Sequence, residues 1–422
     1  MTSNSNIPFV ALRYRDFRLL WFGQLISQAG SAMQLVAINW HVSVLTNYDP
    51  LALGLVGLSR VVPILFFSLL GGAMADAYDR RKVMLVTQSV MALTAVALAL
   101  LTDAGLKAIW PIYALNAISA SASAFDGPAR QALVPSLVSR EHLTNALSLN
   151  AAMGQGATIV GPMLAGLLIG GHSISIVYWI NALSFLAVIG ALLIMHPTPA
   201  VTSSRKIDLG SVREGLLFVR RSSIISSTML LDFFATFFSS ASQLLPIFAA
   251  KILNVGPQGF GLLEAAPAIG AVITSGVMSW VSRVGRPGAW ILWSVAAYGL
   301  ATVLFGLSTS FALSLICLGL TGVADTISMI LRQLIRQLVT PDHIRGRMTS
   351  VNMIFFMGGP QLGEVEAGAM AALIGAPLSV VTGGLGCLLA VAVIAWKVPT
   401  LRRYDEEDLK RAGEALALTA GK

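Results

Sequence analysis

The feature that most constrains this chain is its succession of apolar stretches, each near the length that a helix needs to cross a lipid bilayer. A spanning helix takes about 20 mostly apolar residues, and backbone in hydrocarbon must satisfy its hydrogen bonds internally. Only 11% of the residues are charged, against about 25% in a soluble domain. Twelve stretches fit: residues 17–45, 51–75, 83–102, 109–125, 146–170, 174–195, 223–250, 258–281, 289–308, 311–331, 348–374 and 378–397. We therefore predict an all-α polytopic membrane protein with twelve transmembrane helices.

Lysine and arginine lie almost entirely on one side of the predicted helices. Of the 28 such residues, 25 fall in the N-terminal segment, in the connectors from even to odd helices, or in the C-terminal tail. Lys107 and Lys251 fall on the other side, and Arg60 lies within the second helix. Because cytoplasmic loops carry an excess of Lys and Arg, we predict that both termini lie in the cytoplasm. The net charge of +8 is thereby explained, and no nucleic-acid partner is expected.

The longest connector divides the predicted helices into two groups of six. The predicted domains are an N-terminal half, a cytoplasmic linker, a C-terminal half and a cytoplasmic tail, at residues 1–195, 196–222, 223–397 and 398–422. Within the linker, Val212, Leu216 and Val219 recur at helical spacing among charged residues. This pattern predicts a short amphipathic helix at the membrane surface.

A weak internal repeat supports the division into halves. Shifting the chain by 202 residues superimposes Arg130 on Arg332 and residues 148–150 on 350–352. The same shift places the fourth and fifth predicted helices on the tenth and eleventh. Parallel duplication of a six-helix unit is the layout of major facilitator transporters, whose substrate site lies near mid-bilayer between the halves.

A charged motif follows the second predicted helix, in the sequence GGAMADAYDRRK at residues 71–82. It resembles the signature loop of the major facilitator superfamily, which has a glycine, an aspartate four residues later and then a basic pair. The matching residues are Gly72, Asp76, Arg80 and Arg81, whereas Ala77 and Asp79 depart from the pattern. The segments RYRDFRLLWFGQLISQAG and DGPARQALVPSLVSREHLTNALSLN further resemble the branch of enterobactin exporters and drug-efflux proteins. This resemblance implies a multi-pass protein of the bacterial inner membrane.

The resemblance implies a role for the signature loop in gating. In that superfamily the signature aspartate and arginine form a charge cluster that closes the cytoplasmic side and touches the start of the eleventh helix. If the matching residues of this sequence have the same role, Asp76 and Arg80 are gating residues, together with Gly72 and Arg81. The alternative is that the basic residues only anchor the topology.

Small residues mark the fifth and eleventh predicted helices. The sequence GATIVGPMLAG at residues 156–166 resembles a glycine–proline motif of antiporters in the same superfamily. Small residues let backbones approach closely, and a proline within a helix removes one hydrogen bond. The predicted helix-packing residues are Gly161, Pro162, Gly166, Gly363 and Gly368. Ordinary tight packing is the alternative to an antiporter function.

Charges inside the predicted spans are candidates for coupling, because such residues are costly in a bilayer and mostly functional. Asp232 is the strongest candidate for a proton site, since no basic residue lies within two turns of it. The alternative is a structural carboxyl group satisfied by Ser239 or Ser240. Glu364 and Glu366 point about 200° apart on a helix, and we predict that one of them pairs with Arg60 across the two halves. In the alternative, both glutamates face water.

Polar and aromatic residues supply candidates for the substrate cavity. They are Gln24, Gln28, Gln34 and Asn39 on the first predicted helix, and Phe237 and Gln243 on the seventh. Amides in membrane helices also join helices to one another, and aromatic residues also face lipid or the core. Both alternatives stay open at this point.

Other function classes find little support in the sequence. No nucleotide-binding loop or zinc-protease motif is present, and both cysteines, Cys317 and Cys387, lie in apolar stretches. We expect no catalytic residues, metal or cofactor. The prediction is a monomeric secondary transporter in a lipid bilayer that exports small amphipathic molecules, drug-like or siderophore-like, by proton antiport. The alternatives are an importer with the same fold, a non-transporting sensor and a membrane-embedded enzyme.

Overall fold

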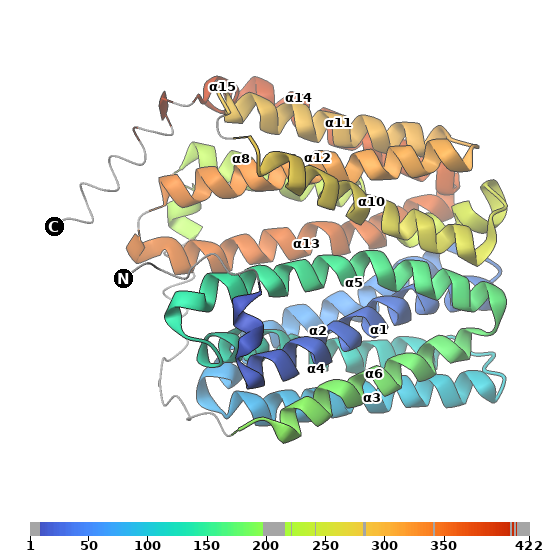
Figure 1. Ribbon diagram of the computed structural model, residues 1–422. Coiled ribbons are helices and arrows are strands. Elements are labelled where there is room, and N and C mark those ends of the chain that lie inside the picture. The colour runs from blue at the N-terminus through green and yellow to red at the C-terminus, as the bar shows by residue number, and fades with distance from the viewer. Residues whose placement is uncertain are drawn as a thin grey trace. The chain divides into compact units, whose positions relative to one another are not determined.

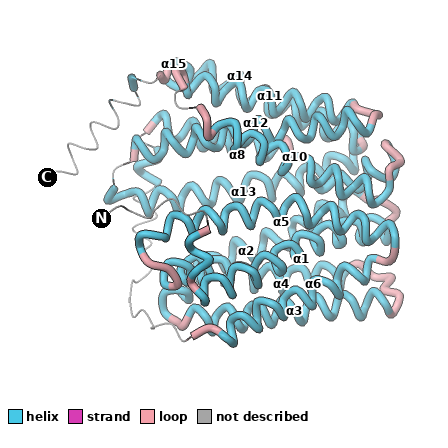
Figure 2. Tube along the Cα trace, viewed as in Figure 1, coloured by secondary structure: helices cyan, strands magenta, loops and turns pink. Residues whose placement is uncertain are grey.

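The computed structural model describes residues 9–196, 216–220, 222–240, 242–281, 284–340, 342–405, 407–408 and 411. Within these ranges every regular element is a helix, and Figure 2 shows the helices joined by short loops. The predicted linker helix falls mostly outside the described residues, although residues 216–220 are helical. The chain divides into two compact units, 1–207 with 255–265 and 208–254 with 266–422.

The first unit is built from six long helices (Figure 1). They are α1 (Arg15–Leu45), α2 (Pro50–Ala77), α3 (Arg80–Asp103), α4 (Trp110–Leu133), α5 (Leu143–Gly171) and α6 (Ile174–Ile194). Short 3-10 helices occupy Val10–Arg13, Val134–Ser136 and Arg140–His142. Helix α1 packs against α5 and α6, and α4 packs against α2 and α3. The first turns of α10, within residues 255–265, also belong to this unit.

The second unit repeats this plan with one interruption. Its helices are α8 (Ser223–Phe238), α9 (Leu245–Ile247), α10 (Gly256–Met278), α11 (Pro287–Leu307), α12 (Phe311–Val339), α13 (Asp342–Ile374), α14 (Ala376–Lys397) and α15 (Pro399–Arg403). A 3-10 turn at Ser242–Leu244 and a π-helix at Phe248–Ile252 flank α9. The sequence predicted one helix over 223–250, but α8 ends at Phe238. The Ser240 hydroxyl donates to the Pro360 carbonyl at 2.9 Å, and such side-chain hydrogen bonds to the backbone compete with a continuous helix.

Local sequence explains several helix ends. The Asp49 side chain accepts a hydrogen bond from the Leu51 amide at 3.0 Å, with Pro50 in the first turn of α2, as a helix start favours. The Asp79 side chain caps α3 through the Arg81 amide at 3.0 Å. Gly375 separates α13 from α14 with a φ of 86°, a conformation that glycine adopts without a steric penalty.

The long helices correspond in order to the twelve predicted spans. In the described part of the chain, nine helical segments are both long and apolar enough to cross a membrane. Helices α1, α4 and α13 are long but lie outside that group. Helix α12 extends to Val339 instead of ending near residue 331, because Leu331 and Ile335 continue its buried face. This extension carries Arg332 and Arg336 into the helix.

Candidate functional site

Asp232 lies in a buried charge cluster of the second unit. Helix α8 supplies Asp232, and α12 supplies Arg332 and Asp325. The Arg332 guanidinium lies 2.7 Å from an Asp232 carboxylate oxygen and 3.7 Å from an Asp325 carboxylate oxygen. The side chains of Arg332 and Asp232 are only 3% and 7% exposed. The expectation that Asp232 has no basic partner is therefore wrong.

The reason for this error is the length of α12. The predicted span ends at residue 331, which leaves Arg332 in a connector, whereas α12 continues through Arg332 to Val339. Two signals pointed to the longer helix. Leu331 and Ile335 keep the helical period of buried residues, and the internal repeat superimposes Arg332 on Arg130, which lies in the last turn of α4.

The first unit holds a related but differently charged cluster. Arg130 on α4 donates a hydrogen bond to the Gln24 side chain on α1 at 3.0 Å. Asp126, one turn before Arg130, accepts hydrogen bonds from Thr87 at 3.0 Å and from Gln88 at 2.9 Å. Gln24, a predicted cavity residue, is 3% exposed and joins α1 to α4. The internal repeat superimposes Arg130 on Arg332, and the first unit therefore holds this arginine with an amide where the second uses a carboxylate.

A polar pocket lies wholly within the first unit. Its volume is about 260 Å³, and its lining includes Gln34 on α1, Arg60 on α2 and Asn181 on α6. The Asn181 amide donates to the Gln34 side chain at 2.7 Å, which fixes both groups at the pocket wall. Two other predicted cavity residues, Gln28 and Asn39, do not line this pocket.

The predicted residues Gln243 and Glu364 lie together in the second unit. The Gln243 amide donates a hydrogen bond to a Glu364 carboxylate oxygen at 3.0 Å. Glu366, two residues farther along α13, is partly buried. The rings of Phe237 and Phe233 stack at 5.9 Å between centroids. A pair between Arg60 and either glutamate would join the two units, and it stays a prediction.

The signature motif joins helix ends within the first unit. The Arg80 guanidinium donates to the Ala75 carbonyl at 3.2 Å and to the Ala132 carbonyl at 2.9 Å. The Arg81 guanidinium donates to the Leu193 carbonyl at 3.1 Å. The last carbonyls of a helix lack partners within the helix, so these arginines satisfy the ends of α2, α4 and α6. The side chain of Asp76 is outside the described part of the structure.

Several glycines mark close approaches between helices. A Cβ on Gly161 would collide with Ala32 of α1, and one on Gly166 would lie 3.1 Å from the Cα of Gly261 on α10. On α13, a Cβ on Gly363 would collide with the Phe237 carbonyl of α8, and Gly368 is buried. Pro162 lies inside α5 and is buried. A Cβ on Gly72, the glycine of the signature motif, would have no atom within 4 Å, whereas its neighbour Gly71 packs against the Ala124 carbonyl of α4.

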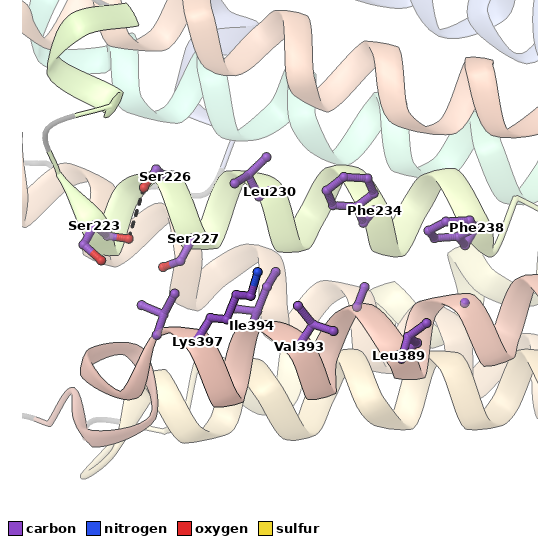
Figure 3. Close-up of a pocket in the computed structure, with 13 residues that line it drawn as sticks. Ser223, Ser226, Ser227, Leu230, Phe234, Phe238, Leu389, Val393, Ile394 and Lys397 are labelled. Atoms are coloured by element: carbon purple, nitrogen blue, oxygen red, sulfur yellow. Dashed lines mark hydrogen bonds between the residues drawn. The ribbon is translucent and has the colours of Figure 1, made fainter.

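A mainly apolar groove separates α8 from α14 in the second unit (Figure 3). Phe234 and Phe238 line it from α8, and Leu389 and Val393 line it from α14. Its volume is about 390 Å³, and Leu389 is 65% exposed. No three His, Cys, Asp or Glu side chains among the described residues are grouped as a metal site.

Long apolar helices that pack closely and bury charged side chains are typical of a polytopic membrane protein. Residues 6–417 match the family described as transmembrane secretion effector, a family of the major facilitator superfamily, and the chain belongs to it. The protein is therefore a transporter and not an enzyme. The predicted all-α major facilitator fold is confirmed.

The chain is also similar to named relatives and, in its fold, to solved structures. The enterobactin exporter of Shigella boydii serotype 4 is 27% identical over 92% of this chain and 93% of its own length. The enterobactin exporter of Escherichia coli O81 shows the same identity and coverage. A mutant of the nucleoside transporter NupG superimposes with a TM-score of 0.73 and 13% identity, covering 91% of this chain and all of that one. A bacterial homologue of ferroportin gives 0.69 and 16%, covering 90% and 98%.

Proposed function

We propose that the protein exports small amphipathic molecules across the bacterial inner membrane by alternating access, as a monomer with both termini in the cytoplasm. The observation that carries this proposal is the match of nearly the whole chain, residues 6–417, to a family of secretion effectors. Relatives that match 92% of the chain are enterobactin exporters. The excess of Lys and Arg in the predicted cytoplasmic connectors supports the orientation.

The buried cluster of α8 and α12 supports proton coupling. Arg332 lies between two carboxylates, nearer to Asp232 than to Asp325. A proton bound at Asp232 neutralises that carboxylate and removes its attraction for Arg332, which then interacts with Asp325 alone. Changing one proton therefore changes which contacts hold α8 to α12. Antiport requires such a link between protonation and helix packing.

The signature loop supports a cytoplasmic gate. Arg80 and Arg81 hold the ends of three helices through backbone carbonyls. Breaking these hydrogen bonds frees several helix ends together. In this proposal Asp76 and Gly72 complete the gate.

Export is tested in cells that lack their own efflux pumps. We expect cells that express the protein to accumulate less of an amphipathic dye, from a panel that includes the anion fluorescein and the cation rhodamine 6G, than cells with an empty vector. Dissipating the proton gradient should remove the difference. Equal accumulation of a broad panel of amphipathic dyes in both strains would contradict export, and higher accumulation with the protein would favour the importer.

Coupling is tested with Asp232→Asn in everted membrane vesicles that carry an imposed pH gradient. We expect gradient-driven dye uptake to fall at least tenfold, because asparagine cannot bind and release a proton. Asp49→Asn is the matched control, since Asp49 caps α2 outside the spans and asparagine also caps helices. Unchanged gradient dependence in Asp232→Asn would place the proton site elsewhere.

A further inference from the structure

The polar pocket of the first unit has one charged group in its lining. Arg60 reaches it from α2, and none of the residues that line it is acidic. Among the residues that the structure describes, the Arg60 side chain makes no ion pair and no hydrogen bond. Two other arginines inside long helices, Arg130 and Arg332, have side-chain partners. Arg130 has the Gln24 side chain as a partner and Arg332 has Asp232.

The position of Arg60 makes this lack of a partner significant. Helix α2 begins at Pro50, and a rise of about 1.5 Å per residue places Arg60 about 15 Å along its axis. The hydrocarbon core of a bilayer is about 30 Å thick, so Arg60 lies near its middle. A charged side chain at this depth is unfavourable unless it faces a cavity or a partner, and it marks a ligand pathway by default.

The rest of the lining complements an anion. Ser31, Ser119 and Ser123 face the pocket, and their hydroxyls have no hydrogen-bond partner among the described residues. The Asn116 amide at the pocket wall donates to the Ser59 hydroxyl at 2.8 Å, so its position is fixed. Ile38 and Ile64 supply apolar surface beside these groups.

We propose that this pocket binds the anionic oxygen group, a carboxylate or phenolate, of an acidic amphipathic substrate. The Arg60 guanidinium pairs with the anion, as its planar fork of donors favours. The serine hydroxyls donate to the remaining oxygen lone pairs, and the isoleucines contact the apolar body. The inference rests on the proposed function and names its substrate class. It gives acidic amphiphiles preference over cationic ones.

A pair of dyes with one ring system and opposite charges tests this. Fluorescein is an anion at pH 8, and rhodamine 6G is a cation with the same xanthene core. Binding of each dye to the purified full-length protein in phosphatidylcholine nanodiscs is measured by fluorescence polarisation. We expect fluorescein to bind more tightly than rhodamine 6G. Arg60→Gln should weaken fluorescein binding at least tenfold and change rhodamine 6G binding less than threefold.

Two further variants keep the test independent of folding effects. Asn116→Asp is nearly isosteric and gives Arg60 a carboxylate inside the pocket, so it should also weaken fluorescein binding at least tenfold. Lys107→Gln removes one positive charge from an exposed loop residue outside the pocket and should change nothing. Arg60→Lys should retain part of the fluorescein affinity, because it keeps the positive charge.

The outcomes separate this inference from the proposed function. Fluorescein binding that survives both Arg60→Gln and Asn116→Asp would overturn the inference, and so would wild-type preference for rhodamine 6G. Neither result contradicts the proposed export function if cells that express the wild-type protein still accumulate less dye than control cells. If the purified protein prefers fluorescein but the cells export no dye, the proposed function is contradicted and the inference about the pocket is not.

Discussion

At the scale of single residues, Arg332 contacts two aspartates, Asp232 and Asp325, in the second unit. Its guanidinium and the Asp232 carboxylate are almost fully removed from solvent, while the Asp325 side chain is 47% exposed. A buried pair gains little net stability, but removing one partner leaves an uncompensated charge at a cost of about 3–5 kcal/mol. The arginine is thus the member whose loss costs most, because it leaves two acids together.

We predict that Arg332→Leu lowers the thermal stability of the purified protein more than Asp232→Leu does. The double variant should recover at least half of the loss, because it removes the pair together. Cys317 and Cys387 are both buried, so the labelling of these thiols by a reactive fluorophore during heating measures unfolding. Additive losses in the double variant would show that the two side chains do not stabilise each other.

At the scale of elements, glycines determine how closely the helices pack. Gly166 of α5 and Gly261 of α10 meet backbone to backbone inside the first unit, and a Cβ at either position would lie 3.1 Å from an atom of the other glycine. Without a hydrophobic force between helices in lipid, such close packing is a main source of association. The helix pair therefore depends on the absence of a single methyl group at each position.

We predict that Gly166→Ala destabilises the protein by about 1–3 kcal/mol, the typical cost of overpacking, and lowers its melting temperature by several degrees. Gly156→Ala on the same helix is the matched control. A Cβ there has no atom within 4 Å, so the higher helix propensity of alanine should leave stability equal or slightly raised. Equal melting temperatures for both variants would refute the packing argument.

At the scale of the whole molecule, transport requires a gate that opens and closes. Arg80 holds the ends of α2 and α4 through two backbone carbonyls, and we propose that the signature loop closes the cytoplasmic side. A residue that holds helix ends in one state and releases them in another changes the rate of transport more than the amount of folded protein.

We predict that Arg80→Ala and Asp76→Asn each slow dye export at least tenfold, while membrane abundance stays near that of the parent. Lys82→Gln is the control. Lys82 is an exposed basic residue of the same segment, and in this proposal it contributes only to the positive charge that sets the membrane orientation. Export rates and immunoblots of membrane fractions give the two measurements. If both variants export dye at the rate of the parent protein, the motif has no gating role and serves only to set the membrane orientation.

The sequence by itself determined the order and approximate position of the long helices, because most of them follow a local run of apolar residues whose backbone groups must pair within the run. It also determined individual helix ends, such as the cap at Asp49.

Only the tertiary structure decided the partners of buried polar groups. Asp232 and Arg332 are separated by 100 residues, and their pairing depends on the true length of α12 and on the packing of α8. Likewise, Gln24 and Gln34 are amides of one helix, yet Gln24 accepts from Arg130, whereas Gln34 lines a pocket beside Arg60. Their separate roles follow from the helices that face them, because electrostatic and hydrogen-bonding interactions act over a few ångströms in space whatever the separation along the chain.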